Sequence, residues 1–291
     1  MSKLQQVLEN KEFAITTEMA PPKGTDFTHI IECAKLIKGR VHAVNVTDFQ
    51  SAAVKATSLS MCLELINLGL EPVLQLTGRD RNRIAIQGEL LTAGHFGIEN
   101  ILSLTGDHTV VGDNPQAKPV YDLDSIGILQ AAEILMTGED MGGNKLDGTP
   151  EFFLGASITP EYEPFELQMM KTKLKIKAGA KFFQTQGVYE IETMRKLREA
   201  TKDMGIYILA GIIPLKSAGM AKYMNKNVPG INVPDYIIER LQKSENKVQE
   251  GIKIAAELIT QLKEENLCEG IHIMAIGAEE NVPLILDEAG L

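Results

Sequence analysis

The sequence has no tryptophan, only three cysteines and no excess of positive charge. Cys33, Cys62 and Cys268 form no C-x-x-C pair, and three scattered thiols cannot hold a four-thiolate iron–sulfur cluster. We interpret them as buried small hydrophobic side chains and expect no metal site. The formal net charge of -10 argues against nonspecific binding to nucleic acid or to an anionic membrane surface, because both require a positive face.

Long apolar runs are also missing. No stretch approaches the roughly 18 apolar residues that a membrane-spanning helix needs, and the polar segment 1–11 lacks the apolar region of a signal peptide. We therefore expect a cytoplasmic chain with no membrane span. The sequence also lacks the GxGxxG, GxxxxGK(S/T), HExxH and GxSxG motifs. Dinucleotide, P-loop, metalloprotease and serine-hydrolase signatures are thus absent.

What the sequence does contain is a regular alternation of short β-branched runs and longer helix-like segments. Eight such runs alternating with helices predict an α/β protein with a (β/α)8 TIM barrel. Apolar residues make up 44% of the chain, enough for a packed core. The predicted strands are Ala14–Glu18, Val41–Thr47, Pro72–Thr77, Ile101–Thr105, Phe152–Ser157, Lys181–Gln186, Tyr207–Gly211 and Ile271–Ile276.

The segments between these runs predict helices, and a glycine follows most of them, as is usual where a helix ends before a strand. We expect one barrel domain over residues 1–291, with extra helices near the C-terminus. The predicted helices are Asp26–Lys38, Lys55–Leu68, Arg79–Phe96, Asp124–Met136, Pro164–Ala178, Tyr189–Met204, Val233–Leu241, Asn246–Glu265 and Val282–Ala289.

Polar residues at the C-terminal ends of the strands are the functional candidates, because TIM barrels carry their active sites on that face. The loop 106–119 follows the fourth strand and is long, so it is a further candidate. The Gly-rich stretch 138–150 follows a helix and is expected to be a surface excursion on the opposite face. The candidates are Glu18, Thr47, Thr77, Asp107, Gln184 and Gln186.

Glu18 ends the first strand and precedes Pro21 and Pro22. A carboxyl group in the barrel mouth can serve as a general acid. The alternative is a structural carboxylate paired with a neighbouring lysine.

Two further motifs carry polar groups to the same face. In Leu104-Thr-Gly-Asp107, the glycine allows close approach of the backbone to a ligand and the aspartate can accept hydrogen bonds, although a plain turn would have the same sequence. In Gln184-Thr-Gln186, strand alternation places both amides on one face, where they could bind a heteroaromatic ligand or pack in a polar layer inside the barrel.

The five histidines are dispersed along the chain. His108 lies in the long loop and is the one histidine we expect near the site. His42 and His272 occur early in predicted strands, and we expect them to pack near the bottom of the barrel.

Together these motifs resemble those of the methylenetetrahydrofolate reductase family, flavin-dependent enzymes of one-carbon metabolism. The resemblance extends over about residues 12–291. It rests on Thr-Glu-x-x-Pro-Pro22, Val-Asn-Val-Thr47, Gln-Leu-Thr77, Leu-Thr-Gly-Asp107, Lys175-Ile-Lys-Ala-Gly-Ala180, Gln-Thr-Gln186 and Gly211-Ile-Ile-Pro-Leu215.

The resemblance implies roles for individual residues. Glu18 matches the family's catalytic acid, and Asp107 matches an aspartate near both flavin and pterin. Glu18, Asp107, Gln184 and Gln186 would contact the folate. The implied reaction is hydride transfer from reduced FAD or FMN to 5,10-methylenetetrahydrofolate, which gives 5-methyltetrahydrofolate. The positions implied to bind flavin are Thr47, Gln75, Thr105, Gly106, Asp107, His108, Tyr121 and Lys175.

Four positions depart from the family pattern. Gln75 replaces a histidine, Thr105 replaces an arginine, Ala218 replaces a stacking phenylalanine and Ala278 replaces an arginine. The chain is thus similar to short reductases of anaerobic one-carbon pathways, some of which work beside a zinc or iron–sulfur partner subunit. The electron donor would be NAD(P)H or such a partner, and an oligomer is expected.

Two other functions remain open at this point. One is a flavin-free pterin-binding barrel of the methyltransferase type. The other is a non-catalytic subunit of a redox complex, suggested by Gln75, Thr105 and Ala218. A flavin spectrum that is bleached by reductant and restored by methylenetetrahydrofolate would distinguish the reductase from both.

Overall fold

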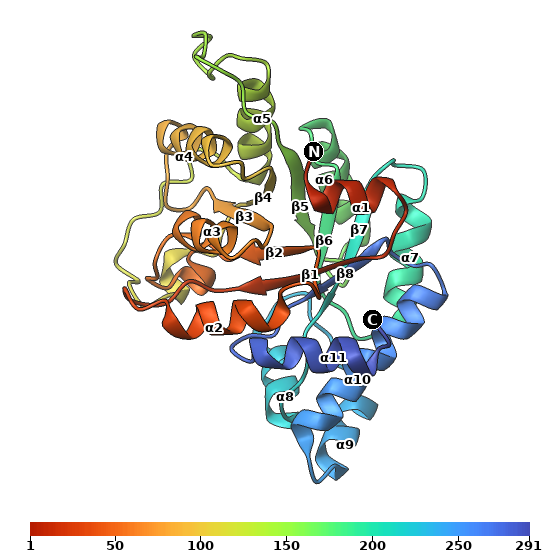
Figure 1. Ribbon diagram of the computed structural model, residues 1–291. Helices are drawn as coiled ribbons and strands as arrows, with labels where there is room; N and C mark the ends of the chain where they lie inside the picture. The colour runs from red at the N-terminus through yellow and green to blue at the C-terminus, as the bar shows by residue number, and fades with distance from the viewer.

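The computed structural model describes residues 1–291 and consists of a closed barrel of eight parallel strands in sequence order, surrounded by helices (Figure 1). The predicted TIM barrel is therefore confirmed, and each predicted strand is found within about three residues of its expected ends. The strands are β1 (Ala14–Met19), β2 (Ala43–Val46), β3 (Pro72–Thr77), β4 (Asn100–Leu104), β5 (Phe153–Ile158), β6 (Phe182–Gly187), β7 (Tyr207–Ile212) and β8 (Gly270–Ile273).

The helices cover the outside of the barrel, where the alternate strand residues form one apolar core with them. The three short 3-10 helices are η1 (Gln50–Ala52), η2 (Thr109–Val111) and η3 (Glu279–Asn281). The α-helices are α1 (Lys3–Glu9), α2 (Thr28–Ile37), α3 (Ser58–Asn67), α4 (Arg83–His95), α5 (Ser125–Met136), α6 (Phe165–Lys177), α7 (Ile191–Thr201), α8 (Ala218–Asn227), α9 (Asp235–Lys243), α10 (Lys247–Glu264) and α11 (Val282–Glu288).

The N-terminal end of the barrel interior is apolar and is closed by α1, which the sequence analysis did not predict. Leu4, Val7 and Leu8 recur at helical spacing and pack with the first inward-facing strand residues, such as Phe153 and Phe182. Ser2 caps this helix by accepting a hydrogen bond from the Gln5 backbone N–H. Asn100, at the first residue of β4, is a buried polar side chain at this end, and the other buried polar residues of the interior lie further toward the C-terminal end.

The α4 helix begins four residues later than predicted, and this difference matters for the site. The side chain of Asn82 accepts hydrogen bonds from the backbone N–H groups of Ile84 and Ala85, which fixes the N-cap there. Arg79 and Arg81 consequently lie in the loop between β3 and α4, at the C-terminal mouth of the barrel, rather than on the outer helix.

The remaining differences lie in the surrounding elements. The α8 helix was not predicted, and it packs with α9 and α10 in a separate apolar cluster that includes Ala221 and Leu241. The segment 138–150 projects beyond α5 as a mostly exposed excursion closed by a Glu139–Lys145 bridge, as expected (Figure 1). No helix combines the length and apolar character needed to span a bilayer.

Candidate active site at the mouth of the barrel

A layer of polar side chains lies inside the barrel, between the apolar residues at its N-terminal end and the C-terminal mouth. Asn45 of β2 and Gln184 of β6 face each other across the interior and exchange two hydrogen bonds of 2.7 and 3.0 Å. Gln184 is 3% exposed, so its amide is already satisfied within the protein. This geometry supports the packing interpretation of Gln184. The pairing of β6 shifts register between Gln184 and Gly187, so the simple alternation expected for Gln184 and Gln186 is interrupted.

Glu18 lies at the end of β1 and is 8% exposed. Its carboxylate Oε2 is 3.7 Å from Nε2 of His272 on β8, the only ion-pair partner that Glu18 has in the structure. The lysine pairing considered for Glu18 is therefore not formed. The position expected for His272 is wrong: strand β8 is short, so its third residue already reaches the polar layer beneath the mouth rather than the bottom. His42 does lie at the N-terminal end, where its Nδ1 accepts from the Ile15 backbone N–H.

An open cleft of about 400 Å³ adjoins Glu18. The Ala20–Lys23 turn after β1 forms one part of its wall, and Ile276 and Gly277 after β8 form another. Lys23 pairs with Asp113 of the long loop and thereby connects the first and fourth strand-to-helix loops. Glu18 is thus reachable by a ligand although it is largely buried.

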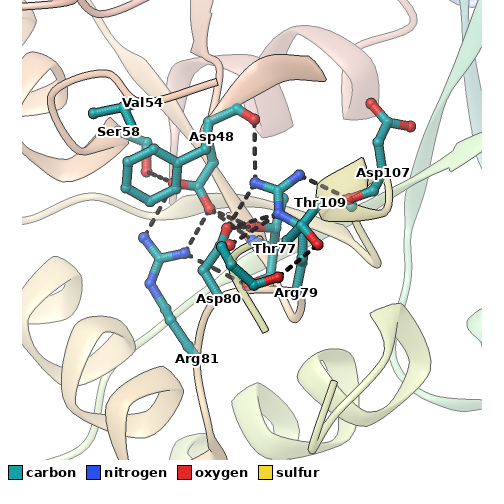
Figure 2. A network of polar contacts seen from close by, with 12 residues as sticks. Asp48, Val54, Ser58, Thr77, Arg79, Asp80, Arg81, Asp107 and Thr109 are labelled. Carbon is teal, nitrogen blue, oxygen red and sulfur yellow. Dashed lines mark hydrogen bonds and ion pairs between the residues drawn. The ribbon is translucent and has the colours of Figure 1, made fainter. Parts of the chain in front are cut away.

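A buried charged network on the β2–β4 side was not identified from the sequence (Figure 2). Asp48, which follows β2, accepts hydrogen bonds from Arg81 at 2.7 and 3.0 Å and from the Thr77 hydroxyl at 2.7 Å. Arg81 also pairs with Glu89 on α4 at 2.6 Å. Thr77 was a ligand candidate, but its hydroxyl is used by Asp48. The charged run Arg79-Asp-Arg81 directly after a strand was the signal that could have revealed this network.

Arg79 connects this network to the loop that carries Asp107. Its guanidinium donates to the backbone oxygen of Asp107 at 3.0 Å and to that of Phe49 at 3.1 Å, and it pairs with Asp80 at 2.6 Å. The side chain is 2% exposed. In Figure 2 the Asp107 carboxylate points away from these contacts. Arg79 therefore fixes the Asp107 backbone and leaves its carboxylate free.

The start of the long loop requires glycine at position 106. Gly106 has φ +88°, and an added Cβ would lie 3.1 Å from the Arg79 Cβ. The Tyr121 hydroxyl donates to the Gly106 backbone oxygen at 3.2 Å. Asp107 and His108 are exposed, and the His108 ring lies 6.5 Å from that of Tyr121. The Thr105 hydroxyl accepts a hydrogen bond from the Ser125 backbone N–H. This bond ties the start of the long loop to the first residue of α5.

Two groups at the mouth have donor capacity that the protein does not use fully. The Thr47 hydroxyl is buried without any hydrogen-bond partner. The Lys175 amine reaches from α6 to the Ser157 backbone oxygen at 2.6 Å. Burial, reinforced by Lys171, lowers the Lys175 pKa to about 8. The Thr47 hydroxyl is enclosed by protein, and the Lys175 amine already has one acceptor.

The other candidates are distributed around the mouth. Gln75 is 7% exposed on β3. Gln186 is half-buried, and its side-chain oxygen accepts from the Gly187 backbone N–H at 3.0 Å. No hydrogen bond or ion pair joins Glu18 to Asp107. The structure therefore places the two candidate acids apart, Glu18 at the end of β1 and Asp107 in the loop after β4.

The three cysteines are buried, as predicted. Burial, with Glu279 and Glu280 nearby, raises the pKa of the Cys33 thiol. Burial also raises the pKa of Cys268 to about 12. Neutral, buried thiols of this kind are unreactive.

Known proteins with similar sequences bear the name that the motifs suggested. The chain is 25% identical over 248 residues to a probable methylenetetrahydrofolate reductase (NADPH) of Caenorhabditis elegans, an alignment that covers 83% of this chain and 34% of that protein. It is 22% identical over 222 residues to the 5,10-methylenetetrahydrofolate reductase of Salmonella typhimurium, covering 73% of this chain and 68% of that protein. The chain thus spans about a third of the length of the nematode relative.

A solved structure shares the fold over the full length. It is described as an uncharacterized protein from Clostridium thermocellum that binds two copies of 5-methyl-5,6,7,8-tetrahydrofolic acid, with a TM-score of 0.66, 18% identity, and coverage of 99% of this chain and 98% of that chain. The family model described as methylenetetrahydrofolate reductase matches residues 3–290. Because that match covers almost the whole sequence, the chain belongs to the methylenetetrahydrofolate reductase family.

Proposed function

We propose that this protein reduces 5,10-methylenetetrahydrofolate to 5-methyltetrahydrofolate with a bound flavin, FAD or FMN, at the C-terminal mouth of the barrel. The observation that carries the proposal is the buried Glu18 carboxyl group, which opens onto a cleft of about 400 Å³ and faces His272. Family membership and the folate described in the Clostridium thermocellum structure support the substrate.

The residues present fit a flavin. The unpartnered Thr47 hydroxyl can donate to a carbonyl or phosphate oxygen, and Gly106 allows the backbone to approach a flat ring. Lys175 offers an ammonium group for a phosphate, since at neutral pH its charge is retained below a pKa of about 8. When bound in its reduced form, the flavin would supply a hydride to the methylene carbon.

The chain's own residues then deliver the proton and orient the folate. Glu18 delivers a proton to the folate nitrogen that releases the methylene bridge. Asp107, whose backbone is held by Arg79, accepts hydrogen bonds from pterin N–H groups. Gln186 offers an amide that can turn from the Gly187 N–H to the folate. Gln184 supports the floor of the site through Asn45.

Titration of the purified chain with FAD and with FMN, followed by flavin fluorescence, tests the cofactor. We expect one of them to bind tighter than about 10 μM, which corresponds to roughly -6.8 kcal/mol. Binding of neither flavin at that level would contradict the proposal. A protein that binds folate but no flavin would instead favour the methyltransferase-like alternative.

The electron donor is a separate part of the proposal. We expect slow flavin reduction by NADH or NADPH alone and faster reduction with a zinc or iron–sulfur partner subunit. Ala218 and Ala278 are 8% and 5% exposed and provide neither a ring nor a cation for a nicotinamide nucleotide. The Phe49 ring already lies 5.4 Å from the Arg81 guanidinium, whereas Tyr223 is exposed.

Stopped-flow reduction of the flavin-loaded chain by each nucleotide tests this expectation. Loss of one stacking ring gives up about 0.5–1.5 kcal/mol, or up to roughly tenfold in affinity. Rapid, saturable reduction by either nucleotide without a second protein would contradict the donor proposal and leave the flavin and folate proposals intact.

A further inference from the structure

We propose that Asp113 is a positioning residue that shapes the cleft beside Glu18 by holding the loops after β1 and β2 against the loop after β4. The inference rests on the proposed folate reduction for its catalytic meaning. Asp113 does not line the cleft itself. It would therefore act on a bound folate through the residues that it holds, and its structural effect can be tested without any substrate.

Asp113 contacts two loops that form walls of the cleft. Its carboxylate pairs with the ammonium group of Lys23, which lines the cleft after β1. The same carboxylate accepts from the Val54 backbone N–H, at 3.0 Å to Oδ1 and 3.3 Å to Oδ2. In the sequence, Val54 lies between Gln50 and Lys55, which line the cleft on the β2 side. One carboxylate of the loop after β4 thus joins two walls of the cleft.

The segment after β2 has a backbone conformation that depends on contacts with other loops. Phe49, Ser51 and Ala52 have φ values of 44, 56 and 55°, in the left-handed region that residues with a Cβ rarely adopt. Such strain persists only where the surrounding structure over-determines the conformation. Here Arg79 donates to the Phe49 backbone oxygen at 3.1 Å, and the Asp113 carboxylate holds the other end of the segment.

The backbone beside Asp113 also lies directly against the segment after β2. A Cβ added to Gly112 would lie 2.0 Å from the Ala52 backbone oxygen, so this close approach requires glycine. The loops after β1 and β2 are joined as well, because the Ala56 backbone N–H donates to the Pro22 backbone oxygen at 2.9 Å. Loss of the Asp113 carboxylate should therefore loosen both walls of the cleft.

Asp113 is a stronger point of attachment than its lysine partner. The Lys23 ammonium group, with the Asn114 side-chain amide and the Val54 backbone N–H, holds the pKa of Asp113 below its ordinary value. The Lys23 side chain is 66% exposed, so water weakens the attraction between the two charges. Substitution of Lys23 would leave the hydrogen bond to Val54 in place, whereas removal of the carboxylate breaks both contacts.

Hydrogen exchange followed by mass spectrometry tests the attachment without any turnover. We expect Asp113→Ala to speed amide exchange in residues 49–56 by about tenfold or more, because the Val54 N–H loses its acceptor and the strained segment can relax. Asp122→Ala is the matched control. Asp122 lies in the same loop and also accepts from a cationic side chain and a backbone N–H, but both belong to Arg83, which does not line the cleft.

Exchange of residues 49–56 that is unchanged in Asp113→Ala, or equally faster in Asp122→Ala, would overturn the proposal. Gly112→Ala provides a second route to the same contact, because the added methyl group would displace the Ala52 backbone oxygen and leave the Asp113 carboxylate in place. If Asp113→Ala does not fold, Asp113→Asn and Gly112→Ala decide the question. Unchanged exchange of residues 49–56 in both of these variants would contradict the attachment.

Steady-state kinetics of the flavin-loaded protein test the positioning role. We expect Asp113→Ala to raise KM for 5,10-methylenetetrahydrofolate about tenfold and to leave kcat within about threefold, because the cleft loses its shape while the proton donor stays. Lys23→Met should raise KM less, and Asp122→Ala should leave it unchanged. An unchanged KM in Asp113→Ala, or a loss confined to kcat, would contradict the role. If the wild-type protein fails to reduce folate, the proposed function fails, while the exchange result still decides whether Asp113 holds the two loops.

Discussion

The two sides of the barrel mouth hold their positive charges in different ways. On the β2–β4 side, Arg79 and Arg81 are buried and paired with Asp80, Asp48 and Glu89. On the β5–β8 side, Lys175 and Lys216 donate to backbone oxygens and have no carboxylate partner. On the first side, carboxylates therefore balance the arginine charges. We call these buried ion pairs the frame, because they fix the geometry of the loops. The second side has lysines without a carboxylate partner, which is the arrangement that the proposed anionic cofactor would need, although the whole protein is acidic.

Substitution of Glu18 should have the largest effect on activity. Glu18 is on β1, which lies between the two sides of the mouth and pairs with both β2 and β8. Glu18→Gln keeps the shape and removes the proton source. We expect folate turnover to fall about 10²–10⁴-fold, the usual cost of losing a positioned acid. Reduction of the flavin by an artificial donor should survive. Folate turnover within about threefold of wild type would rule out the assigned role.

Breaking the buried frame should be the largest effect on stability. Arg81→Leu leaves Asp48, whose side chain is fully buried, without its cation. We expect the free energy of unfolding in urea to fall by about 3–5 kcal/mol. Arg83→Leu is the matched control, because Arg83 pairs with Asp122 in an exposed position and should cost about 0–1 kcal/mol. Equal effects of the two substitutions would show that the frame is not specially stabilising.

Removing Lys175 tests the opposite side. Lys175→Met should weaken flavin binding by roughly tenfold or more, since a charge-assisted hydrogen bond contributes about 1.5–3 kcal/mol. It should not lower the free energy of unfolding, because burial already disfavours the ammonium group. A loss of stability without a loss of flavin affinity would assign Lys175 to the structure rather than to the ligand.

The pH dependence of the same lysine gives an independent check. Its folded pKa of about 8 lies below the unfolded value of about 10.4, so the unfolded chain binds more protons between these values. Relative to Lys175→Met, wild-type stability should therefore rise as pH increases from about 8 to about 10.4. Flavin affinity should fall over the same range as the ammonium charge is lost. Identical pH profiles for the two proteins would contradict the lowered pKa.

A pair of threonines gives the smallest predicted effect, with opposite signs at two positions. Thr77→Val removes a donor to Asp48 and should destabilise the fold by about 1–2 kcal/mol. Thr47→Val removes a buried hydroxyl that has no partner and should stabilise the flavin-free fold by about 1 kcal/mol. Of the two threonine substitutions, Thr47→Val is the one expected to weaken flavin binding without destabilising the protein. Destabilisation by Thr47→Val would mean that its hydroxyl already has a partner, such as water.

The barrel itself could be predicted because the strands are short β-branched runs, most of which end in a polar residue or glycine, and most of the helices between them are followed by a glycine stop signal. Two helices escaped prediction for a physical reason. The α1 helix has only seven residues, and its apolar positions become meaningful once the barrel bottom is known. The α8 helix mixes polar and apolar residues, and it is stabilised by packing with α9 and α10.

The site was predictable at the level of single residues but not of pairs. Glu18 was recognised from its place at a strand end. Its contact with His272 could not be seen, because these residues are 254 positions apart and meet only when β8 closes the barrel onto β1. Arg79 and Arg81 were assigned to a helix because the capping role of Asn82 was not recognised.

Single-turnover oxidation of the reduced, flavin-loaded protein by 5,10-methylenetetrahydrofolate tests the central claim most directly. The flavin is reduced anaerobically, the folate is added, and the flavin absorbance and the folate products are followed together. The account predicts return of the oxidised flavin spectrum with formation of one 5-methyltetrahydrofolate per flavin. A flavin that stays reduced in the presence of excess folate, or 5-methyltetrahydrofolate formed without any flavin oxidation, would contradict it.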